Sequence, residues 1–350
     1  MDLAGTFLVP DFYTTFRCKC GDCRMSCCEG WDINISQQEY FELLGLETSE
    51  ELQSRISRSF YIQRGATPDH YATLNHDWLG RCPLRGEDGL CMLQVEQGEK
   101  AIPTICRLYP RSIRSELSEA TLSNSCEGIV ELLLKRSTPI RFVSETLPYA
   151  STGWERPDRF ALRMQCIGMI QDRRSSPKES ILAMGNLLCG CAEGNRSFED
   201  NLNALFPFCD LYAEISPSLT DYCIKAKESL TGIREEEYRR ICVELSSHYP
   251  HIEQTMENLI VNHLFYEKFP YSETRENEEE EYISLCGLIA FLDLLIAGNA
   301  ESMVSQEALV DLLSRAFRMI EHTSFHYNAH LLLSEAGYDT PGDAMCLIAL

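Results

Sequence analysis

The stretch Cys18-Lys19-Cys20-Gly21-Asp22-Cys23-Arg24-Met25-Ser26-Cys27-Cys28 decides how this chain is organised. It contains a CxxC spacing followed by an adjacent cysteine pair, and so places five thiols on one short loop. Soft thiolates select zinc, copper or iron–sulfur clusters, whereas magnesium and calcium prefer oxygen ligands. The stretch therefore predicts a metal centre.

Four further cysteines stand singly downstream, each beside turn-forming or polar residues: Cys82, Cys91, Cys106 and Cys126. A structural zinc site usually takes its four ligands from two separated CxxC or CxxH knuckles, and the second knuckle is missing here. The single cysteines also do not match the usual ferredoxin spacing. An iron–sulfur cluster is therefore favoured and zinc is the alternative. Because a four-iron cluster uses only four cysteines, about half of the array could be unligated core thiols.

The cysteine content also indicates the cellular compartment in which the protein is expected. The amino terminus MDLAGTFLVPDF has no basic segment followed by a long apolar run, so it does not resemble a signal peptide. We expect a cytoplasmic protein, in which disulfides rarely persist and clustered thiolates usually bind metal or act in catalysis. The odd count of 17 cysteines disfavours the alternative, an exported disulfide protein. The eight cysteines after residue 126 are assigned to the core, and the Cys189-Gly190-Cys191 pair is only a weak ligand signal.

The net charge of the chain limits the classes of partner that it is expected to bind. The chain has 53 acidic and 31 basic residues and a formal net charge of −22, which repels nucleic acid and anionic membrane surfaces. A basic or lysine-bearing protein surface would suit this field better, although acidity also simply favours solubility. The most apolar stretch, Ile283 to Ile296, is interrupted by Asp293 and falls short of the roughly 20 residues that span a bilayer, so a buried helix is expected there.

Local signals predict a mainly α protein, a cysteine-rich metal-binding N-terminal module followed by a helical domain. The spacing of helix caps occurs at three places: Ser36 with Glu39, Thr48 with Glu51, and Ser176-Pro177 with Glu179. Apolar residues recur at helical spacing around Leu259 and from Leu309 to Ile320, and no sustained strand alternation competes. The predicted boundaries are a cysteine-rich module over residues 1–135, a helical domain over 136–272, an acidic loop over 273–282 and a C-terminal helical section over 283–350.

Three histidines near the C-terminus offer a second metal hypothesis. His322, His326 and His330 recur at i, i+4 and i+8, which on one continuous helix would align them. No carboxylate pair completes such a site, and histidines of a helical tail need no ligand to explain them. We therefore favour the structural interpretation.

A set of motifs resembles a known family, the bacterial flagellin lysine-N-methylases, whose cysteine module also looks like the CxxCxxxCC zinc- or iron-chelating proteins. The motifs are Pro10-Asp11-Phe12, Phe16-Arg17-Cys18, Gly21-Asp22-Cys23, Cys27-Cys28, Gly30-Trp31-Asp32-Ile33, Gly80-Arg81-Cys82-Pro83-Leu84, Asp88-Gly89-Leu90-Cys91, Cys106-Arg107-Leu108-Tyr109-Pro110-Arg111 and Leu122-Ser123-Asn124-Ser125-Cys126. Weaker similarity appears at Glu257-Asn258-Leu259, Phe269-Pro270 and Ile320-Glu321-His322. Cys20 and the segment Ser125-Cys126-Glu127-Gly128 depart from the family pattern.

The resemblance implies methyl transfer from S-adenosylmethionine to lysines of flagellin, in the cytoplasm, by a protein with a four-iron cluster. The cysteines that match the family positions are Cys18, Cys23, Cys27, Cys28, Cys82, Cys91, Cys106 and Cys126. The rival hypothesis is a non-catalytic module that binds or senses iron or zinc.

The location of a methyl-transfer site is open, because the chain contains no GxG and no alternating strand–helix pattern. A lysine nucleophile must lose its proton before it attacks, so the site needs desolvation or a base. Asp11, Asp32 and Tyr109 are candidates for this role, although each could instead cap a turn or pack in the core. Arg107 and Arg111 could bind a cofactor carboxylate or the cluster, although structural ion pairs would explain them equally well.

Overall fold

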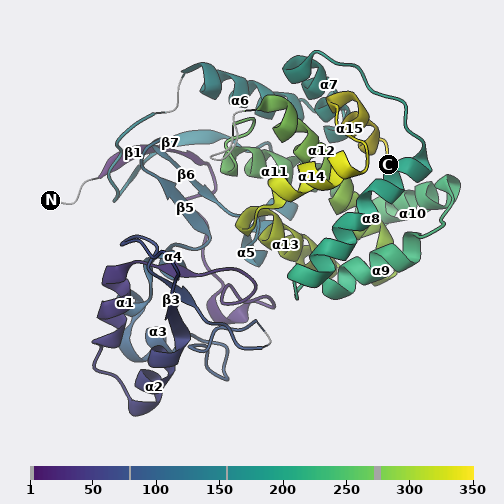
Figure 1. The fold of residues 1–350 in the computed structure, drawn as a ribbon. Helices are drawn as coiled ribbons and strands as arrows, with labels where there is room; N and C mark the ends of the chain where they lie inside the picture. The colour runs from purple at the N-terminus through teal and green to yellow at the C-terminus, as the bar shows by residue number, and fades with distance from the viewer. Residues whose placement is uncertain (1–3, 79, 155–156, 272–276) are drawn as a thin grey trace. The chain divides into compact units, whose positions relative to one another are not determined.

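The computed structural model describes residues 4–78, 80–154, 157–271 and 277–350 (Figure 1). The chain divides into two compact units, a larger one made of Met1–Phe16 with Ser112–Leu350 and a smaller one made of Arg17–Arg111. The cysteine-rich segment is thus inserted into the larger unit after its first strand. This division differs from the predicted boundary at residue 135, because the chain returns to the larger unit well before that residue.

The smaller unit combines short helices with a three-stranded antiparallel sheet of order β2-β4-β3. Its strands are β2 (Asn34–Ile35), β3 (Phe60–Ile62) and β4 (Ala72–Leu74). Its helices are α1 (Gln37–Leu44), α2 (Glu50–Ser59), α3 (Met92–Gln97) and α4 (Thr104–Leu108), with short 3₁₀ turns at Cys20–Asp22 and Glu99–Ala101. Apolar side chains from α1, α2, α3 and the sheet form its core, and Cys82 and Cys91 pack against that core.

The larger unit contains a four-stranded sheet of order β5-β6-β1-β7. The strands are β1 (Gly5–Pro10), β5 (Arg111–Arg114), β6 (Glu119–Leu122) and β7 (Phe142–Leu147); β1 is parallel to β6 and antiparallel to β7. The helices are α5 (Glu127–Leu134), α6 (Pro157–Ile170), α7 (Pro177–Cys189), α8 (Phe198–Ile215), α9 (Thr220–Leu230), α10 (Glu235–His248), α11 (Ile252–Tyr266), α12 (Glu278–Gly298), α13 (Gln306–His322), α14 (Phe325–Glu335) and α15 (Pro341–Leu347), with a 3₁₀ turn at Ala300–Ser302. The prediction of a mainly α protein is confirmed.

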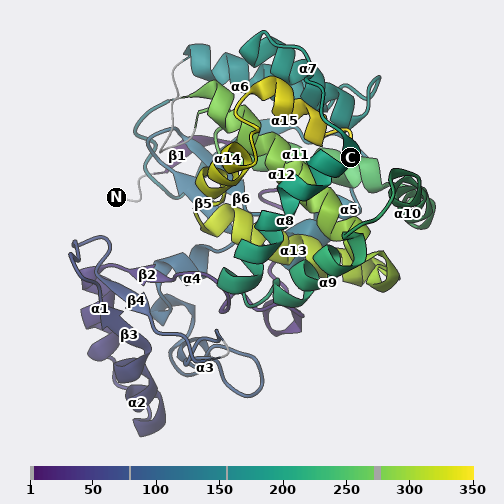
Figure 2. The ribbon, with the colours of Figure 1, turned by 45° about the vertical axis from the view of Figure 1, so that its right-hand side comes forward.

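Helix α12 is the centre of the helical part. It packs against α7, α8, α9, α10, α13, α14 and α15, and Figure 2 shows it surrounded by them. Its 21 residues are long and apolar enough to cross a membrane, but 94% of the apolar window is buried inside the protein. Burial rather than shortness therefore identifies it as a core helix, which confirms the expected buried helix and corrects the length argument.

The acidic run is partly helical, contrary to prediction. Helix α12 begins at Glu278, the side chain of Asn277 accepts a hydrogen bond from the Glu279 backbone N–H, and Glu281 is buried. Negative charges favour a helix N-terminus because the helix dipole is positive there. The predicted loop over 273–282 is therefore wrong from Glu278 onward, and residues 273–276 lie outside the described residues.

The predicted caps can be compared with the helix starts. Ser36 with Glu39 and Ser176 with Glu179 form complete capping boxes. The third cap is Ser49, which accepts from the Leu52 backbone N–H, so the predicted cap at Thr48 is wrong by one residue. A side-chain acceptor one residue later in the chain satisfies the same helix end.

Candidate functional site

Four thiols of the cysteine array converge in the smaller unit: Cys28, Cys82, Cys91 and Cys106. The backbone N–H of Cys82 donates to the carbonyl of Cys28 at 3.1 Å, which joins the dense loop to the downstream segment. Arg85 and Cys91 form an isolated antiparallel bridge, so the chain turns back on itself between Cys82 and Cys91. Cys91 then begins α3 as its N-terminal cap residue.

Cys106 is brought to this group by helix α4. The backbone N–H of Thr104, the first residue of α4, donates to Glu39 at 2.7 Å. Glu39 also closes the capping box of α1, so one carboxylate fixes both helix starts. Although burial opposes it, the hydrogen bonds from Thr104 and Ser36 hold the pKa of Glu39 below its usual value.

The charge of Cys28 raises the pKa of each of the other three thiols. Burial raises the pKa of Cys82 to about 12, with a further contribution from Cys28. Burial also raises the pKa of Cys91 and, well above its usual value, that of Cys106, and the charge of Cys28 adds to both. A thiol that is costly to ionise alone is readily ionised when a metal supplies the compensating charge. The donor set therefore suits a metal centre.

Cys28 is the member that ionises most easily. A hydrogen bond from the Cys27 thiol, together with Ser26 and the Arg85 guanidinium, lowers its pKa to about 6 against the opposing effect of burial. Arg85 is held in place by an ion pair with Glu29. A guanidinium held next to a thiolate stabilises the negative charge of the sulfur and so changes its properties as a ligand.

The remaining cysteines of the array differ in burial, and one of them, Cys27, contacts Cys28 through its thiol. Cys18, Cys20 and Cys27 are exposed and Cys23 is half-buried. Cys126 belongs to the larger unit, where it is buried at the start of α5. The eight predicted ligand positions thus separate into the four converging thiols, three on the loop before Cys28, and Cys126. All seventeen cysteines are among the described residues, and none forms a disulfide.

The spacing of the thiols bears on the kind of metal. Among the residues that the structure describes, no three His, Cys, Asp or Glu side chains are close enough together to hold a single metal ion. A tetrahedral zinc draws its sulfur ligands to about 2.3 Å from one point. A four-iron cluster binds each cysteine at a different iron and so accepts more widely spaced thiols. Four cysteines are also the number of protein ligands that either kind of centre takes.

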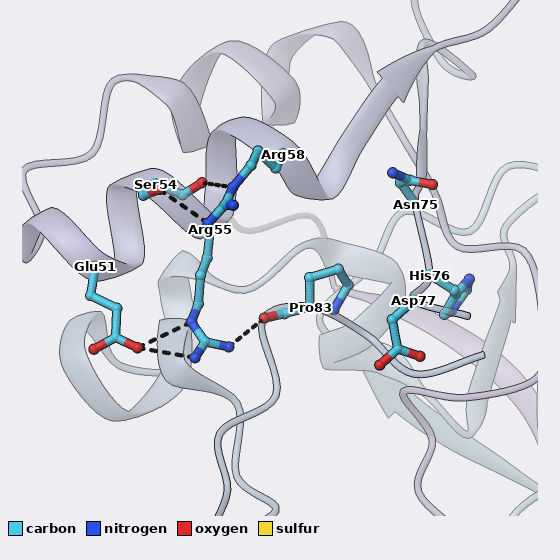
Figure 3. Close-up of a pocket in the computed structure, with 8 residues that line it drawn as sticks. All are labelled: Glu51, Ser54, Arg55, Arg58, Asn75, His76, Asp77 and Pro83. Carbon is cyan, nitrogen blue, oxygen red and sulfur yellow. Dashed lines mark hydrogen bonds and ion pairs between the residues drawn. The ribbon is translucent and has the colours of Figure 1, made fainter. Parts of the chain in front are cut away.

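Two charged cavities adjoin Cys82. One, of about 490 Å³, is lined by residues of α2 and of the segments after β4, including Arg55, Arg58, His76 and Asp77 (Figure 3). The other, of about 460 Å³, is lined by Cys82 and by Arg81 and Arg85 among others.

The Arg55 guanidinium links the lining of the first cavity to the segment that follows Cys82. Arg55 donates to the Pro83 carbonyl at 3.0 Å and to Glu51 at 3.0 Å, and so ties the segment after Cys82 to α2, as Figure 3 shows. The two linings carry charges of both signs, because Arg55 is paired with Glu51 and Arg81 with Asp77.

The three catalytic candidates occupy different surroundings. Asp11, in the larger unit, forms a half-buried ion pair with Arg136 at 2.8 Å. Asp32, in the smaller unit, is exposed, and its charge opposes the lowering of the His76 pKa by burial. Tyr109 stacks on Trp31 with ring centroids 5.6 Å apart. Asp11 therefore has a structural contact that explains it.

Tyr109 likewise has a structural contact. The Trp31 ring on which it stacks donates from Nε1 to the Cys27 carbonyl at 2.9 Å, so the pair anchors the cysteine loop. Of the two arginine candidates, Arg107 is exposed and contacts the Thr104 hydroxyl at 3.3 Å, while Arg111 begins β5 and is half-buried.

The three C-terminal histidines do not share a helix. Helix α13 ends at His322 and α14 begins at Phe325, so only His326 and His330 keep the i, i+4 relation. The hypothesis that His322, His326 and His330 align on one continuous helix is therefore wrong. His263 and Glu321, which the sequence did not single out as site residues, instead meet His326 in a buried polar cluster. Their only signal in the sequence was that Glu321 lies in a family-like motif.

Comparison with known proteins finds a family similarity in the C-terminal part of the chain. Residues 194–347 match the FliB lysine N-methylase C-terminal domain. The chain is 24% identical over 185 residues to the Lysine-N-methylase of Salmonella typhimurium, covering 51% of this chain and 46% of that protein, and the Salmonella choleraesuis protein of the same name gives the same figures. It is 27% identical over 132 residues to the Flagellar biosynthetic protein FliU of Salmonella muenchen, covering 37% of this chain and 77% of that protein.

The extent of these matches limits what they show. The chain spans about half the length of the curated lysine-N-methylases that it matches. No solved structure matches. The cysteine array precedes the matched domain of residues 194–347. The resemblance to the flagellin lysine-N-methylase family is thus supported by the match of residues 194–347 to the FliB lysine N-methylase C-terminal domain and by the relatives named Lysine-N-methylase, whereas the cysteine motif stays a prediction.

Proposed function

We propose that this chain methylates lysine side chains of flagellin, using S-adenosylmethionine, in the cytoplasm before flagellin is exported. The observation that carries the proposal is the match of residues 194–347 to the FliB lysine N-methylase C-terminal domain. The relatives named Lysine-N-methylase and Flagellar biosynthetic protein FliU support the lysine and flagellar parts of the proposal. The net charge of −22 favours encounter with a lysine-bearing surface over an acidic one.

We further propose that Cys28, Cys82, Cys91 and Cys106 hold a four-iron cluster. The support is that the charge of Cys28 raises the pKa of each of the other three thiols, which indicates that all three lie near Cys28. A bound cluster would supply a covalent cross-link between the dense loop, the Cys82–Cys91 turn and α4. The chain's own residues do the rest: Arg85 stabilises the Cys28 thiolate, and Glu39 positions the helix that carries Cys106.

The reaction itself makes simple demands on the protein. The ε-ammonium of lysine must lose a proton so that its nitrogen lone pair can attack the methyl carbon, and the C–S bond then breaks with its electrons on sulfur. The site must therefore bind a cationic side chain and accept one proton. The arginines that line the cavities near Cys82 are the groups proposed to bind the carboxylate of the methyl donor.

The test is to purify the protein anaerobically, measure its iron and sulfide, and incubate it with flagellin and S-adenosylmethionine. Mass spectrometry of flagellin peptides should then show methylated lysines. A brown protein with absorbance at about 400 nm that leaves flagellin unmodified would favour the rival function, a non-catalytic iron-binding module. A colourless protein that contains zinc would reject the cluster.

A further inference from the structure

A groove of about 760 Å³ lies wholly within the larger unit, between α9, α10 and the end of α12. It is larger than either cavity near Cys82 and falls in the roughly 300–1,000 Å³ range of ligand sites. Its lining residues all lie between Ser229 and Val304, and so inside the segment of residues 194–347 that matches the FliB lysine N-methylase C-terminal domain. We call it the α10 groove.

Helix α10 forms one wall of the α10 groove along its length. Glu237, Ile241, Glu244 and His248 line the groove and follow one another at intervals of three or four residues, so they share one face of the helix. Leu245 lies beside them on the same wall. Glu244 and His248 are exposed to solvent, while Ile241 and Leu245 are half-buried. This face of α10 therefore presents acidic and apolar side chains side by side.

Two helices end at the α10 groove. Ser229 and Thr231, at the end of α9, and Gly298, the last residue of α12, all line it. The two helix ends lie close together because residue 298 is a glycine: a Cβ there would lie 2.4 Å from the Cα of Ala226 in α9. Since the C-terminus of a helix carries a partial negative charge, the backbone itself favours a cation at this end of the groove.

The side chains that line the α10 groove add negative charge. Those charged at neutral pH are Glu237, Glu244 and Glu301, and no lysine or arginine of the described residues lines the groove. Glu237 and Glu301 each lie 3.8 Å from an exposed or half-exposed cation, Arg240 and Lys225 respectively, and such long surface pairs contribute little to stability. Among the described side chains, none forms an ion pair with Glu244. A cleft lined by one sign of charge concentrates ligands of the opposite sign.

The apolar part of the lining narrows the class of ligand. Ile241, Leu245, Met303 and Val304 lie among the glutamates, and Val304 is 70% exposed. A metal ion does not suit this lining, because among the described residues no three acidic, histidine or cysteine side chains are close enough to hold one. A lysine side chain suits both components, since its methylene stem packs on apolar surface while its ammonium group reaches a carboxylate.

We propose that the α10 groove is the docking surface for a lysine-bearing segment of the polypeptide substrate. The lysine stems lie on Ile241, Leu245 and Val304, and the ammonium groups face the three glutamates and the ends of α9 and α12. The inference rests on the proposed function for the identity of that substrate, flagellin. The groove contributes to substrate binding and not to the chemical step, so its loss raises KM for flagellin and leaves kcat in place.

The binding test needs no activity. Calorimetric titration of the full chain at low salt should show binding of a short peptide of alternating lysine and alanine, and at least about tenfold weaker binding of the same peptide with glutamine for lysine. The double variant Glu244→Lys with Glu301→Lys should bind the lysine peptide at least about tenfold more weakly than wild type. The matched control is Glu214→Lys with Glu335→Lys, which makes the same change of net charge at two exposed glutamates outside the groove and should keep the wild-type affinity. An equal loss of affinity in the two double variants, or no loss in either, overturns the groove.

The kinetic test uses the same two double variants with flagellin and S-adenosylmethionine. The groove variant, Glu244→Lys with Glu301→Lys, should raise KM for flagellin at least about tenfold and keep kcat within about twofold, whereas the control variant should keep both. Methylation with an unchanged KM in the groove variant overturns the proposal. Peptide binding as predicted in a protein that methylates nothing would support the groove and reject the proposed function.

Discussion

The backbone N–H of Cys82 donates a 3.1 Å hydrogen bond to the carbonyl of Cys28, and this bond joins the dense cysteine loop to the single cysteines that follow it. We predict that serine at any of the four converging positions, Cys28, Cys82, Cys91 or Cys106, removes most of the bound iron, because a cluster needs all four thiolates. Iron and sulfide analysis of anaerobically purified protein measures this.

The matched control for these variants is an exposed cysteine of the same loop. Cys20→Ser should keep the full iron content, because Cys20 is exposed and its pKa is raised by the neighbouring Cys18. Iron loss in Cys20→Ser together with full retention in Cys106→Ser would show that the ligands have been assigned wrongly.

The thiol of Cys28 should be reactive in metal-free protein. Hydrogen bonding from Cys27 lowers its pKa to about 6, so the thiolate predominates at pH 7.5 and declines as the pH falls through 6. Alkylation at Cys28, followed by mass spectrometry between pH 5 and 8, should have its midpoint near 6, whereas Cys106 should remain unmodified because burial raises its pKa. Arg85→Gln should move the midpoint upward, since the Arg85 charge lowers this pKa. A wild-type midpoint near 9 would refute the assignment.

A buried ion pair connects β6 to α6. The Arg163 and Glu119 side chains are 0% and 3% exposed, and Arg163 Nη1 donates to Glu119 Oε2 at 3.1 Å. Arg163→Met leaves the carboxylate buried without its partner and should lower the free energy of unfolding by about 3–5 kcal/mol. The double variant Arg163→Met with Glu119→Gln should recover part of this loss. Arg174→Met, at an arginine that is 89% exposed, should leave the denaturation midpoint unchanged. Equal midpoints for Arg163→Met and wild type would contradict this account.

The raised pKa of Glu267 predicts that the free energy of unfolding depends on pH. Burial raises its folded-state pKa to about 7, above the usual value of 4.5 for a glutamate. The unfolded chain therefore loses this proton first, and the contribution of Glu267 to stability is complete below about 4.5 and is lost as the pH rises through 7. Glu267→Gln should be more stable than wild type at pH 8, by up to about 3 kcal/mol, and nearly equal to it at pH 4.5. Urea denaturation at both values tests this; a gain that is the same at both would count against a raised pKa.

Helices were predictable from the sequence where their signals are local. The capping boxes at Ser36 and Ser176 satisfy backbone groups within one turn, and the apolar spacing of α13 follows from its own residues. The strands were not predictable, because β6 is buried on both faces and shows no alternation. Its partner β1 is far away in the sequence, so their pairing depends on the whole fold.

The candidate sites were likewise predictable only where their signals are local in the sequence. The cysteine array was visible as a pattern, but the choice of Cys28 over Cys18 depends on the hydrogen bond to Cys82 and on burial. His263 and His326 lie on different helices, and only the packing of α11 against α14 reveals their contact. The break between α13 and α14, which separates His322 from His326, had no strong local signal, since no proline or glycine marks it.

The central claim is that this chain transfers methyl groups to flagellin lysines. The most direct measurement is ¹³C NMR of flagellin after incubation with anaerobically purified, iron-loaded protein and S-adenosylmethionine that carries a ¹³C methyl group. We predict new N-methyl signals on lysine ε-nitrogens of flagellin, absent when the protein is left out of the reaction. Flagellin without any ¹³C-methyl signal, in the presence of protein with full iron content, would contradict the claim.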